Sequence, residues 1–226
     1  MAARNDVLER SLFVPDVLPL RAEQPEPVYR RIRSVFDPTI AILGLLACWP
    51  LLFLIAIWVR LDSPGPALFW QERVGCRGRV FRIVKFRTMF IDAPRFSIKR
   101  GHSDPLVTRV GRFLRATGLD ELPQLWNVAR GEMALIGPRP EQLHLLGLYE
   151  DWQLERLAIK PGVTGWWQIH HRDNSPLHEN VEKDIYYIKN QSLMLDLWIV
   201  IATARLMLRP LAFRLSRSEA STEAVS

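Results

Sequence analysis

The longest apolar segment of this chain runs from Thr39 to Val59 and contains no charged residue. A helix rises about 1.5 Å per residue, so a segment of this length can just cross the hydrocarbon core of a bilayer. Pro50 lies near its middle, where it cannot donate a hydrogen bond to the carbonyl of Leu46. The pattern therefore predicts a membrane helix that is sharply kinked at Pro50.

Basic residues flank this helix on both sides: Arg30, Arg31 and Arg33 before it, and Arg60, Arg73, Arg77, Arg79 and Arg82 after it. A simple span would carry one basic flank to the outside, against the positive-inside tendency. A re-entrant helix that enters and leaves on the cytoplasmic side keeps both flanks inside, and we favour it. Proline kinks also occur in true spans, so a simple span is the alternative.

Downstream of the membrane helix, a cluster of helix-breaking residues at 62–66 ends the apolar segment. Residues 67–74 and 80–87 have the composition of two short strands around a glycine-containing turn, which predicts a β-hairpin. Side chains two residues apart point to the same face of a strand. We therefore expect Lys85 and Arg87 on one side of the hairpin.

The rest of the chain is predicted to be mainly helical, with helices at residues 107–116, 121–129, 141–158, 181–190 and 193–208. Only about eight uncharged residues separate Asp196 from Arg205 in the last helix, which is too short to span. We expect this helix to lie in the membrane interface. Four tryptophans suit either the headgroup region or core packing: Trp152, Trp166, Trp167 and Trp198.

A chain of 226 residues suits one domain with its own hydrophobic core. The expected fold class is α+β, mostly helical, with the small hairpin in a domain at residues 62–213. This domain follows an N-terminal extension (1–30) and the re-entrant helix (31–61), and it precedes a disordered tail (214–226). Residues 91–105 are expected to form a loop that either covers a substrate or merely connects two elements.

The charge balance predicts an anionic partner. The chain has 30 basic and 24 acidic residues, a net charge of +6, which suits a phosphate ligand or acidic lipid. No nucleic-acid recognition motif is present, so nucleic acid is not an expected partner. Cys48 and Cys76 are too few for a disulfide framework and fit a reducing cytoplasm. A cleavable signal peptide is not expected, because the apolar segment starts near residue 39 behind a polar leader that contains prolines.

The adjacent carboxylates Asp120 and Glu121 are the first candidate for chemistry. Thr117 in a capping position and Pro123 in a first turn predict that the pair opens a helix. The positive end of a helix favours ionised oxygen, so both side chains are expected to be charged at neutral pH. One carboxylate can then attack while the other holds a cation. The alternative is that both merely stabilise a first turn.

A rigid cation lies close downstream, in the segment Pro138-Arg139-Pro140. Two prolines restrict the backbone around Arg139, and a guanidinium matches two phosphate oxygens. A proline turn with a solvated arginine is the alternative. Further candidate phosphate contacts are Lys85, Arg87, Arg112 and Arg115. Together these residues predict phosphate chemistry at a bilayer surface.

Several motifs, in this order, make the chain resemble the bacterial sugar transferases, the monotopic polyprenyl-phosphate phosphoglycosyl transferases. They are KFRTM at 85–89, DELPQLWNV at 120–128, GEM at 131–133, GPRP at 137–140 and KPGVTGW at 160–166. The resemblance covers residues 31–208. It implies transfer of a sugar phosphate from a nucleotide-diphosphate sugar, such as a UDP-sugar, to polyprenyl (undecaprenyl) phosphate. A nucleoside monophosphate is released, and a magnesium ion assists.

The resemblance also implies roles for individual residues. Lys85, Arg115 and Arg139 are expected phosphate contacts, with Asp196 or Asp184 as a supporting carboxylate; Asp196 could instead cap the last helix. The chemistry of such a site makes Asp120 the nucleophile that forms an aspartyl-phosphosugar intermediate, and Glu121 the magnesium ligand. The expected location is the bacterial inner membrane, with the catalytic domain on its cytoplasmic face, and a homodimer is left open.

The chain departs from the family pattern at one turn, and two other classes of function compete with the transferase. After Ile169 the family has an Asn-Gly-Arg type of turn, whereas this chain has HHRDN at 170–174, which leaves the sugar open. A zinc site of His170, His171 and His178 lacks a fourth ligand, so solvated histidines are expected. The competing functions are a non-catalytic scaffold that binds anionic lipid and a hydrolase of lipid pyrophosphates.

Overall fold

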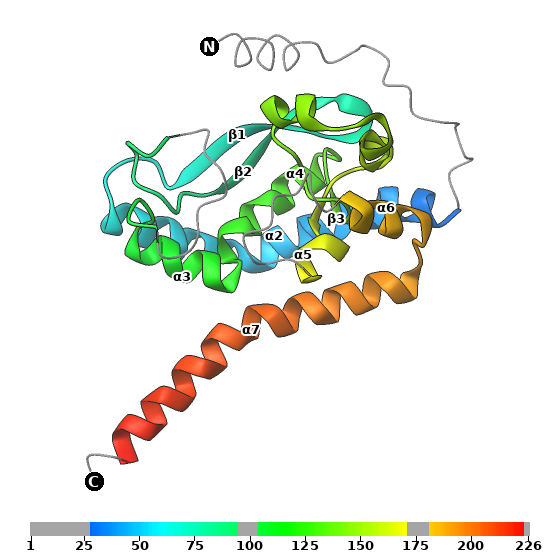
Figure 1. The fold of residues 1–226 in the computed structure, drawn as a ribbon. Helices are drawn as coiled ribbons and strands as arrows, with labels where there is room; N and C mark the ends of the chain where they lie inside the picture. The colour runs from blue at the N-terminus through cyan, green and yellow to red at the C-terminus, as the bar shows by residue number, and fades with distance from the viewer. Residues whose placement is uncertain (1–27, 95–103, 171–180, 224–226) are drawn as a thin grey trace.

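The computed structural model describes residues 28–94, 104–170 and 181–223, with side chains described as far as residue 208 (Figure 1). The fold is α+β and mostly helical, with a β-hairpin and a long apolar N-terminal helix, as predicted. Most of the N-terminal extension, most of the predicted loop at 91–105, and His171 and His178 lie outside the described residues.

Helix α2, Val28–Asp62, contains the whole predicted membrane segment and begins earlier than expected. Its helical conformation continues through Pro38 and Pro50, so neither proline ends it. By length and composition this helix could cross a membrane. The buried residues of α2 form one narrow face that consists of Asp37, Ala41, Ile55 and Val59. Most of its apolar side chains are exposed. Such an apolar surface is stable in lipid rather than in water.

The buried face of α2 forms the floor of the domain along the length of the helix. Near its first half, Ala41 packs with Phe81 of the hairpin and with Val128. Near its second half, Ile55 and Val59 pack in a separate cluster with Phe86, Val110 and Leu114. Burial of these side chains favours one position of the helix on the domain, because it removes apolar surface area from water.

Two small sheets lie above this floor. Strands β1, Leu68–Val74, and β2, Val80–Phe86, form the predicted antiparallel hairpin, with Lys85 opposite Phe69. Strands β3, Ala134–Ile136, and β4, Gly162–Thr164, form a parallel pair that the sequence did not predict. A Cβ on Gly162 would lie 2.0 Å from the nitrogen of Gly137, so only glycine allows this approach.

The helices differ from prediction in the middle of the chain and at its C-terminal end. Residues 141–158 were expected to form one helix but form two 3-10 helices, η3 (Leu143–Leu148) and η4 (Asp151–Ala158), so that prediction was wrong. The remaining α-helices are α3 (Arg109–Thr117), α4 (Leu125–Ala129), α5 (Trp166–His170), α6 (Val181–Lys189) and α7 (Leu193–Glu223). Helix α7 continues past residue 208, where the last helix was predicted to end, into the tail that was predicted to be disordered. Trp167 is a core residue, whereas Trp152 and Trp198 are about half exposed.

Asn127 joins the hairpin to α4. It is buried, its Oδ1 accepts from Val84 N, and its Nδ2 donates to Arg82 O and to Glu132 Oε2. The amide thus satisfies the free edge of β2, where unpaired backbone groups would otherwise be buried.

We expect Asn127→Ala to lower the free energy of unfolding by roughly 2–4 kcal/mol, because it leaves buried polar groups without partners. Denaturant titration of the full chain in detergent measures this. Asn190→Ala is the control: the Asn190 side chain is exposed and, among the described residues, donates to the carbonyl of Tyr186 alone, so its loss should cost less than about 1 kcal/mol. Equal losses in the two variants would contradict the role of Asn127.

Candidate active site

The acidic pair lies in a tight turn between two helices. Helix α3 ends at Thr117, and Gly118 adopts a left-handed conformation with φ of 74°, after which Asp120 and Glu121 occupy the 3-10 helix η2 (Leu119–Gln124). Thr117 was expected to cap the following helix, and this is wrong. Its hydroxyl donates to the carbonyls of Phe113 and Leu114 because it ends α3.

Asp120 is the buried member of the pair, with 8% of its surface exposed. Burial, and next the charge of Glu121, raise the pKa of Asp120 to about 7, although Lys85, Arg115 and Arg139 favour its ionised form. The expectation that Asp120 is fully charged at neutral pH is therefore wrong, because desolvation outweighs the field of the helix end. No described residue donates a hydrogen bond to this carboxyl group.

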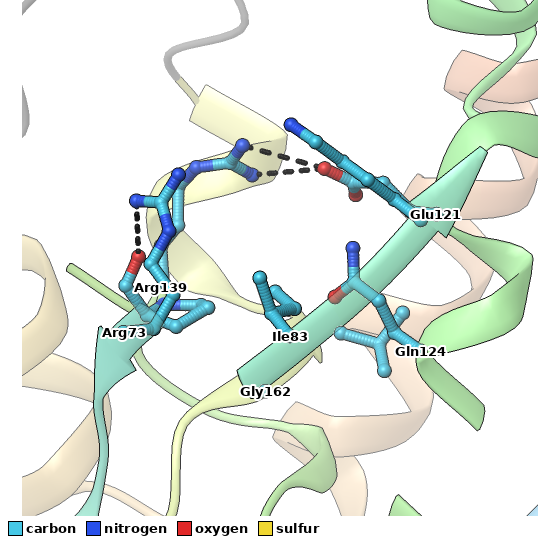
Figure 2. Close-up of a pocket in the computed structure, with 9 residues that line it drawn as sticks. Arg73, Ile83, Glu121, Gln124, Arg139 and Gly162 are labelled. Atoms are coloured by element: carbon cyan, nitrogen blue, oxygen red, sulfur yellow. Dashed lines mark hydrogen bonds and ion pairs between the residues drawn. The ribbon is translucent and has the colours of Figure 1, made fainter. Parts of the chain in front are cut away.

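Glu121 faces a small pocket that contains two of the predicted cations, Lys85 and Arg139 (Figure 2). Both terminal nitrogens of Arg139 lie 3.3 Å from Glu121 Oε1. The lining residues are Arg73, Ile83, Lys85, Glu121, Gln124, Arg139, Pro140, Gly162 and Val163. The structure therefore brings Glu121, Lys85 and Arg139 together at one pocket, with Asp120 and Arg115 adjacent to it.

Arg73 belongs to this pocket and was missed as a site residue. It lies beside Arg139 and donates to Pro140 O at 3.3 Å and to Gln71 Oε1 at 2.7 Å. Burial and the charge of Arg139 lower the pKa of Arg73 to about 10. The alternation of β1 could have found it, because Arg73 and Phe69 share a face and Phe69 pairs with Lys85.

Lys85 experiences the same crowding of positive charge. Burial, and then the charge of Arg73, lower the pKa of Lys85 to about 8, although both carboxylates oppose this shift. A group of like charges held this close is costly in the absence of an anion. The pocket is therefore suited to a ligand with several negative charges, such as a diphosphate.

Arg87 and Arg115 have different surroundings from those of Lys85. Arg115 Nε donates to Thr88 Oγ1 at 2.8 Å, and its charge acts on Asp120. Arg87 instead donates to the carbonyls of Ser63 and Pro64, and so it fastens the turn that follows α2. Lys85 lines the pocket whereas Arg87 does not, so the structure does not bring these two predicted phosphate contacts to one pocket.

Asp184 supports the site through another arginine. Arg156 is buried, its Nη2 lies 2.7 Å from Asp184 Oδ2, and the same nitrogen donates to the carbonyl of Arg139 at 2.6 Å. This pair fixes the backbone that presents the Arg139 guanidinium. Arg156 was also missed, since its partners are distant in sequence.

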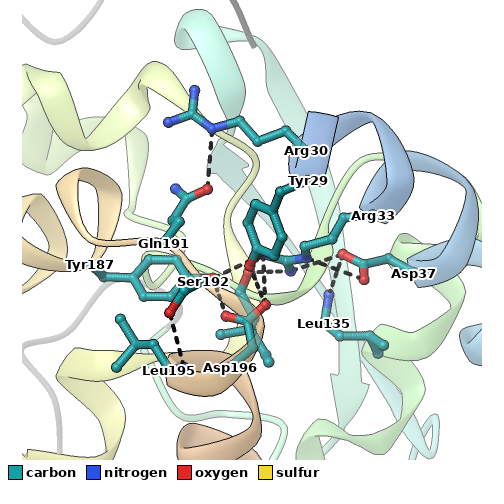
Figure 3. Close-up of polar contacts among 11 residues, drawn as sticks. Tyr29, Arg30, Arg33, Asp37, Leu135, Tyr187, Gln191, Ser192, Leu195 and Asp196 are labelled. Carbon is teal, nitrogen blue, oxygen red and sulfur yellow. Dashed lines mark hydrogen bonds and ion pairs between the residues drawn. The ribbon is translucent and has the colours of Figure 1, made fainter. Parts of the chain in front are cut away.

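Asp196 lies farther away, at the junction of α2, α7 and β3 (Figure 3). It accepts hydrogen bonds from the hydroxyls of Tyr29 and Tyr187 and forms an ion pair with Arg33 at 3.6 Å. Arg33 also donates to Ile136 O at 2.7 Å and pairs with Asp37 at 2.9 Å. Asp196 does not line the pocket. It pairs with Arg33, which holds the end of β3, and β3 leads directly to Arg139, so Asp196 supports the site indirectly.

The donor set fits magnesium better than zinc. Among the described residues, no group of three or more histidine, cysteine, aspartate or glutamate side chains is placed to hold a metal ion. Two adjacent carboxylates remain, and magnesium commonly uses one or two carboxylates together with substrate phosphates. His170, the one described member of the predicted zinc set, has Nδ1 2.8 Å from Trp166 O.

Comparison with known proteins gives a consistent set of relatives. The family profile described as bacterial sugar transferase matches residues 28–210. The chain is 39% identical over 191 residues, 81% of its length, to the UDP-N-acetylgalactosamine-undecaprenyl-phosphate N-acetylgalactosaminephosphotransferase of Aeromonas hydrophila, covering 45% of that protein. It is 42% identical over 188 residues, 76% of its length, to the undecaprenyl-phosphate glucose phosphotransferase of Komagataeibacter xylinus, covering 35%.

A relative of similar size also matches. The exopolysaccharide production protein ExoY of Sinorhizobium fredii is 35% identical over 210 residues, which cover 86% of this chain and 93% of that protein. The chain thus spans less than half the length of the first two relatives and nearly all of the third.

The raised pKa of Asp120 predicts a pH-dependent stability. Between about pH 4 and pH 7 the folded state keeps a proton on Asp120 that the unfolded chain releases, so this group makes the protein less stable as pH rises. We expect Asp120→Asn to raise the apparent Tm of the metal-free protein, by several degrees at about pH 8 and by much less at about pH 5. Thermal scans in EDTA measure this, and a gap independent of pH would contradict the burial effect.

Proposed function

Because this chain belongs to the bacterial sugar transferase family, we propose that it transfers a sugar 1-phosphate from a UDP-sugar to undecaprenyl phosphate. The names of its relatives support this donor and acceptor. Such a transfer would begin the synthesis of a surface polysaccharide or glycoconjugate. The observation that carries the proposal is a buried carboxylate beside a pocket of three cations. Ile83 and Val163, which line this pocket, belong to the same apolar cluster as Ala41 of α2.

In the first step, the Asp120 carboxylate attacks the phosphorus that bears the sugar. A new bond forms between this carboxylate oxygen and phosphorus, and the bond to the bridging oxygen breaks, so that UMP leaves with that oxygen. Arg73, Lys85 and Arg139 are placed to hold the diphosphate and to offset the charge that would repel an anionic nucleophile. The binding of such a dianion also relieves the repulsion among these cations.

In the second step, an oxygen of undecaprenyl phosphate attacks the same phosphorus. The bond to Asp120 breaks, the carboxylate is restored, and the lipid carries the sugar on a diphosphate. One phosphoanhydride bond is consumed and one is made, so the overall transfer needs no ATP. Glu121, with Asp120 beside it, offers the hard oxygen donors that magnesium prefers, and the bound ion would neutralise diphosphate charge.

The proposed membrane topology is re-entrant. Arg33, near the start of α2, binds the carbonyl of Ile136, and Asp62, at its end, accepts from the backbone nitrogen of Val110. Both ends of α2 therefore contact one domain, whereas a helix that crossed a bilayer would hold its ends on opposite sides. We propose that α2 dips into the cytoplasmic leaflet and that α7 lies in the interface, where Leu193, Leu197 and Ile201 are exposed.

The covalent step is tested with the full chain in nanodiscs, given a panel of UDP-sugars without acceptor. We expect intact-mass analysis to show one phosphosugar adduct with release of equivalent UMP. Asp120→Asn should abolish the adduct and lower turnover by roughly three orders of magnitude or more. Asp151→Asn, a change at an exposed aspartate, is the control and should retain both. Full turnover by Asp120→Asn would refute the proposed nucleophile.

Glu121 should behave differently from Asp120. We expect Glu121→Gln to raise the magnesium concentration needed for half-maximal turnover by about tenfold or more, because a carboxylate ligand is lost. Titration of turnover with magnesium measures this. An unchanged magnesium dependence would remove Glu121 from the proposed ligand set.

Topology is tested by cysteine labelling in a Cys48→Ala, Cys76→Ala background. Single cysteines are placed at Arg31, near the start of α2, and at Pro66, just after its end; both positions are exposed. An impermeant maleimide should label neither position in spheroplasts and both in inside-out vesicles. Labelling of one position from the outside would show that α2 crosses the membrane.

A further inference from the structure

A second pocket lies on the domain, apart from the catalytic one. Its volume is about 340 Å³, and we call it the tryptophan pocket; it is lined by Trp70, Arg82, Trp126, Asn127, Arg130 and Glu132. It shares no lining residue with the catalytic pocket. Arg82 precedes Ile83, a residue of the catalytic pocket, so in β2 their side chains point to opposite faces of the hairpin.

Among the described residues, the Arg82 guanidinium of the tryptophan pocket has no carboxylate partner. Arg130 Nε lies 3.2 Å from Glu132 Oε1, and the other oxygen of Glu132 accepts from Asn127. The Arg82 guanidinium lies 5.9 Å from the centre of the Trp70 ring, and no carboxylate among the described residues pairs with it. Two guanidiniums face one carboxylate, so the pocket has a net positive charge and suits an anion.

The tryptophans of this pocket are unusually open to solvent. Trp70 is 43% exposed and Trp126 is 49% exposed. Large aromatic rings with a polar N–H group are enriched where one side of the ring meets lipid and the other meets water. A ligand with both an anionic group and an apolar part would use both features of the pocket.

The position of α4 places this pocket close to the membrane helix. The Leu125 side chain would lie 3.3 Å from a Cβ on Gly44, and Val128 packs with Ala41, so α4 rests directly on α2. Packed helix axes lie about 8–10 Å apart. The headgroup layer on each side of a bilayer is of comparable depth, roughly 5–8 Å. With α2 in the leaflet, Trp126 and Arg130 of this pocket therefore lie near headgroup level.

We propose that the tryptophan pocket binds the phosphodiester headgroup of an anionic phospholipid, with Arg82 and Arg130 on the phosphate and Trp70 and Trp126 at the boundary with the acyl chains. Binding at this site is noncovalent and separate from phosphosugar transfer. It rests on the membrane seating of α2 proposed above and not on catalysis. One lipid held here would fix the depth and tilt of the domain on the membrane.

The test is lipid retention by the full chain in a neutral detergent, measured by native mass spectrometry. Phosphatidylglycerol and phosphatidylcholine are the probes. We expect phosphatidylglycerol to be retained in preference, and the double variant Arg82→Gln, Arg130→Gln to weaken its apparent affinity by about tenfold or more. The matched control, Arg79→Gln with Arg109→Gln, removes the same charge from exposed positions outside both pockets and should retain the lipid.

A second variant keeps the charge of the pocket and removes only a ring. Trp126→Leu should weaken retention of phosphatidylglycerol while the protein stays folded, because this side chain is half exposed. Retention that is unchanged in both pocket variants would overturn the proposal. Displacement of the lipid by millimolar inorganic phosphate would also overturn it, since that result indicates a site for soluble anions. Sugar transfer is not measured here, so a failure of lipid binding is distinct from a failure of the proposed reaction.

Discussion

The packing of α2 against one domain along its length is the constraint on which the other features depend. The helix is apolar over most of its surface, so its few polar contacts decide how it sits. Arg33 and Asp37 hold β3 at one end, and Asp62 holds the start of α3 at the other. Because β3 leads directly into the segment of Arg139, the contacts that fix the position of this apolar helix also fix a cation of the proposed catalytic pocket.

Burial in the proposed catalytic pocket makes the charged forms of its side chains unfavourable when no ligand is bound. Burial raises the pKa of Asp120 and lowers the pKa of both Lys85 and Arg73, so each group is held in an environment that opposes its charged form. An incoming diphosphate compensates the cations, and the cations favour the ionised form of Asp120. The favourable packing of the surrounding fold, including the buried pair of Arg156 and Asp184, offsets the free-energy cost of holding these groups together.

Much of this arrangement could be predicted from local sequence. The apolar run predicted the long apolar helix, the strand pattern predicted the hairpin, and the motifs placed Glu121 and Arg139 in one site. The errors have two causes: local patterns that suit more than one conformation, and contacts between residues that are distant in the sequence. Thr117 has a suitable type for a cap, but Gly118 ends α3 there, and the 3-10 helices at 141–158 carry an apolar pattern that also suits an α-helix. The β3–β4 pair and the supporting role of Arg156 depend on residues far apart in the chain.

The stereochemistry at phosphorus tests the central claim, a covalent intermediate on Asp120, most directly. A UDP-sugar made chiral with oxygen isotopes at the phosphorus that bears the sugar is converted by the full chain in nanodiscs, and the configuration of the lipid product is determined. Two successive in-line displacements, first by Asp120 and then by the lipid phosphate, predict net retention. Net inversion would mean that the lipid phosphate attacks the donor directly, and it would contradict the account.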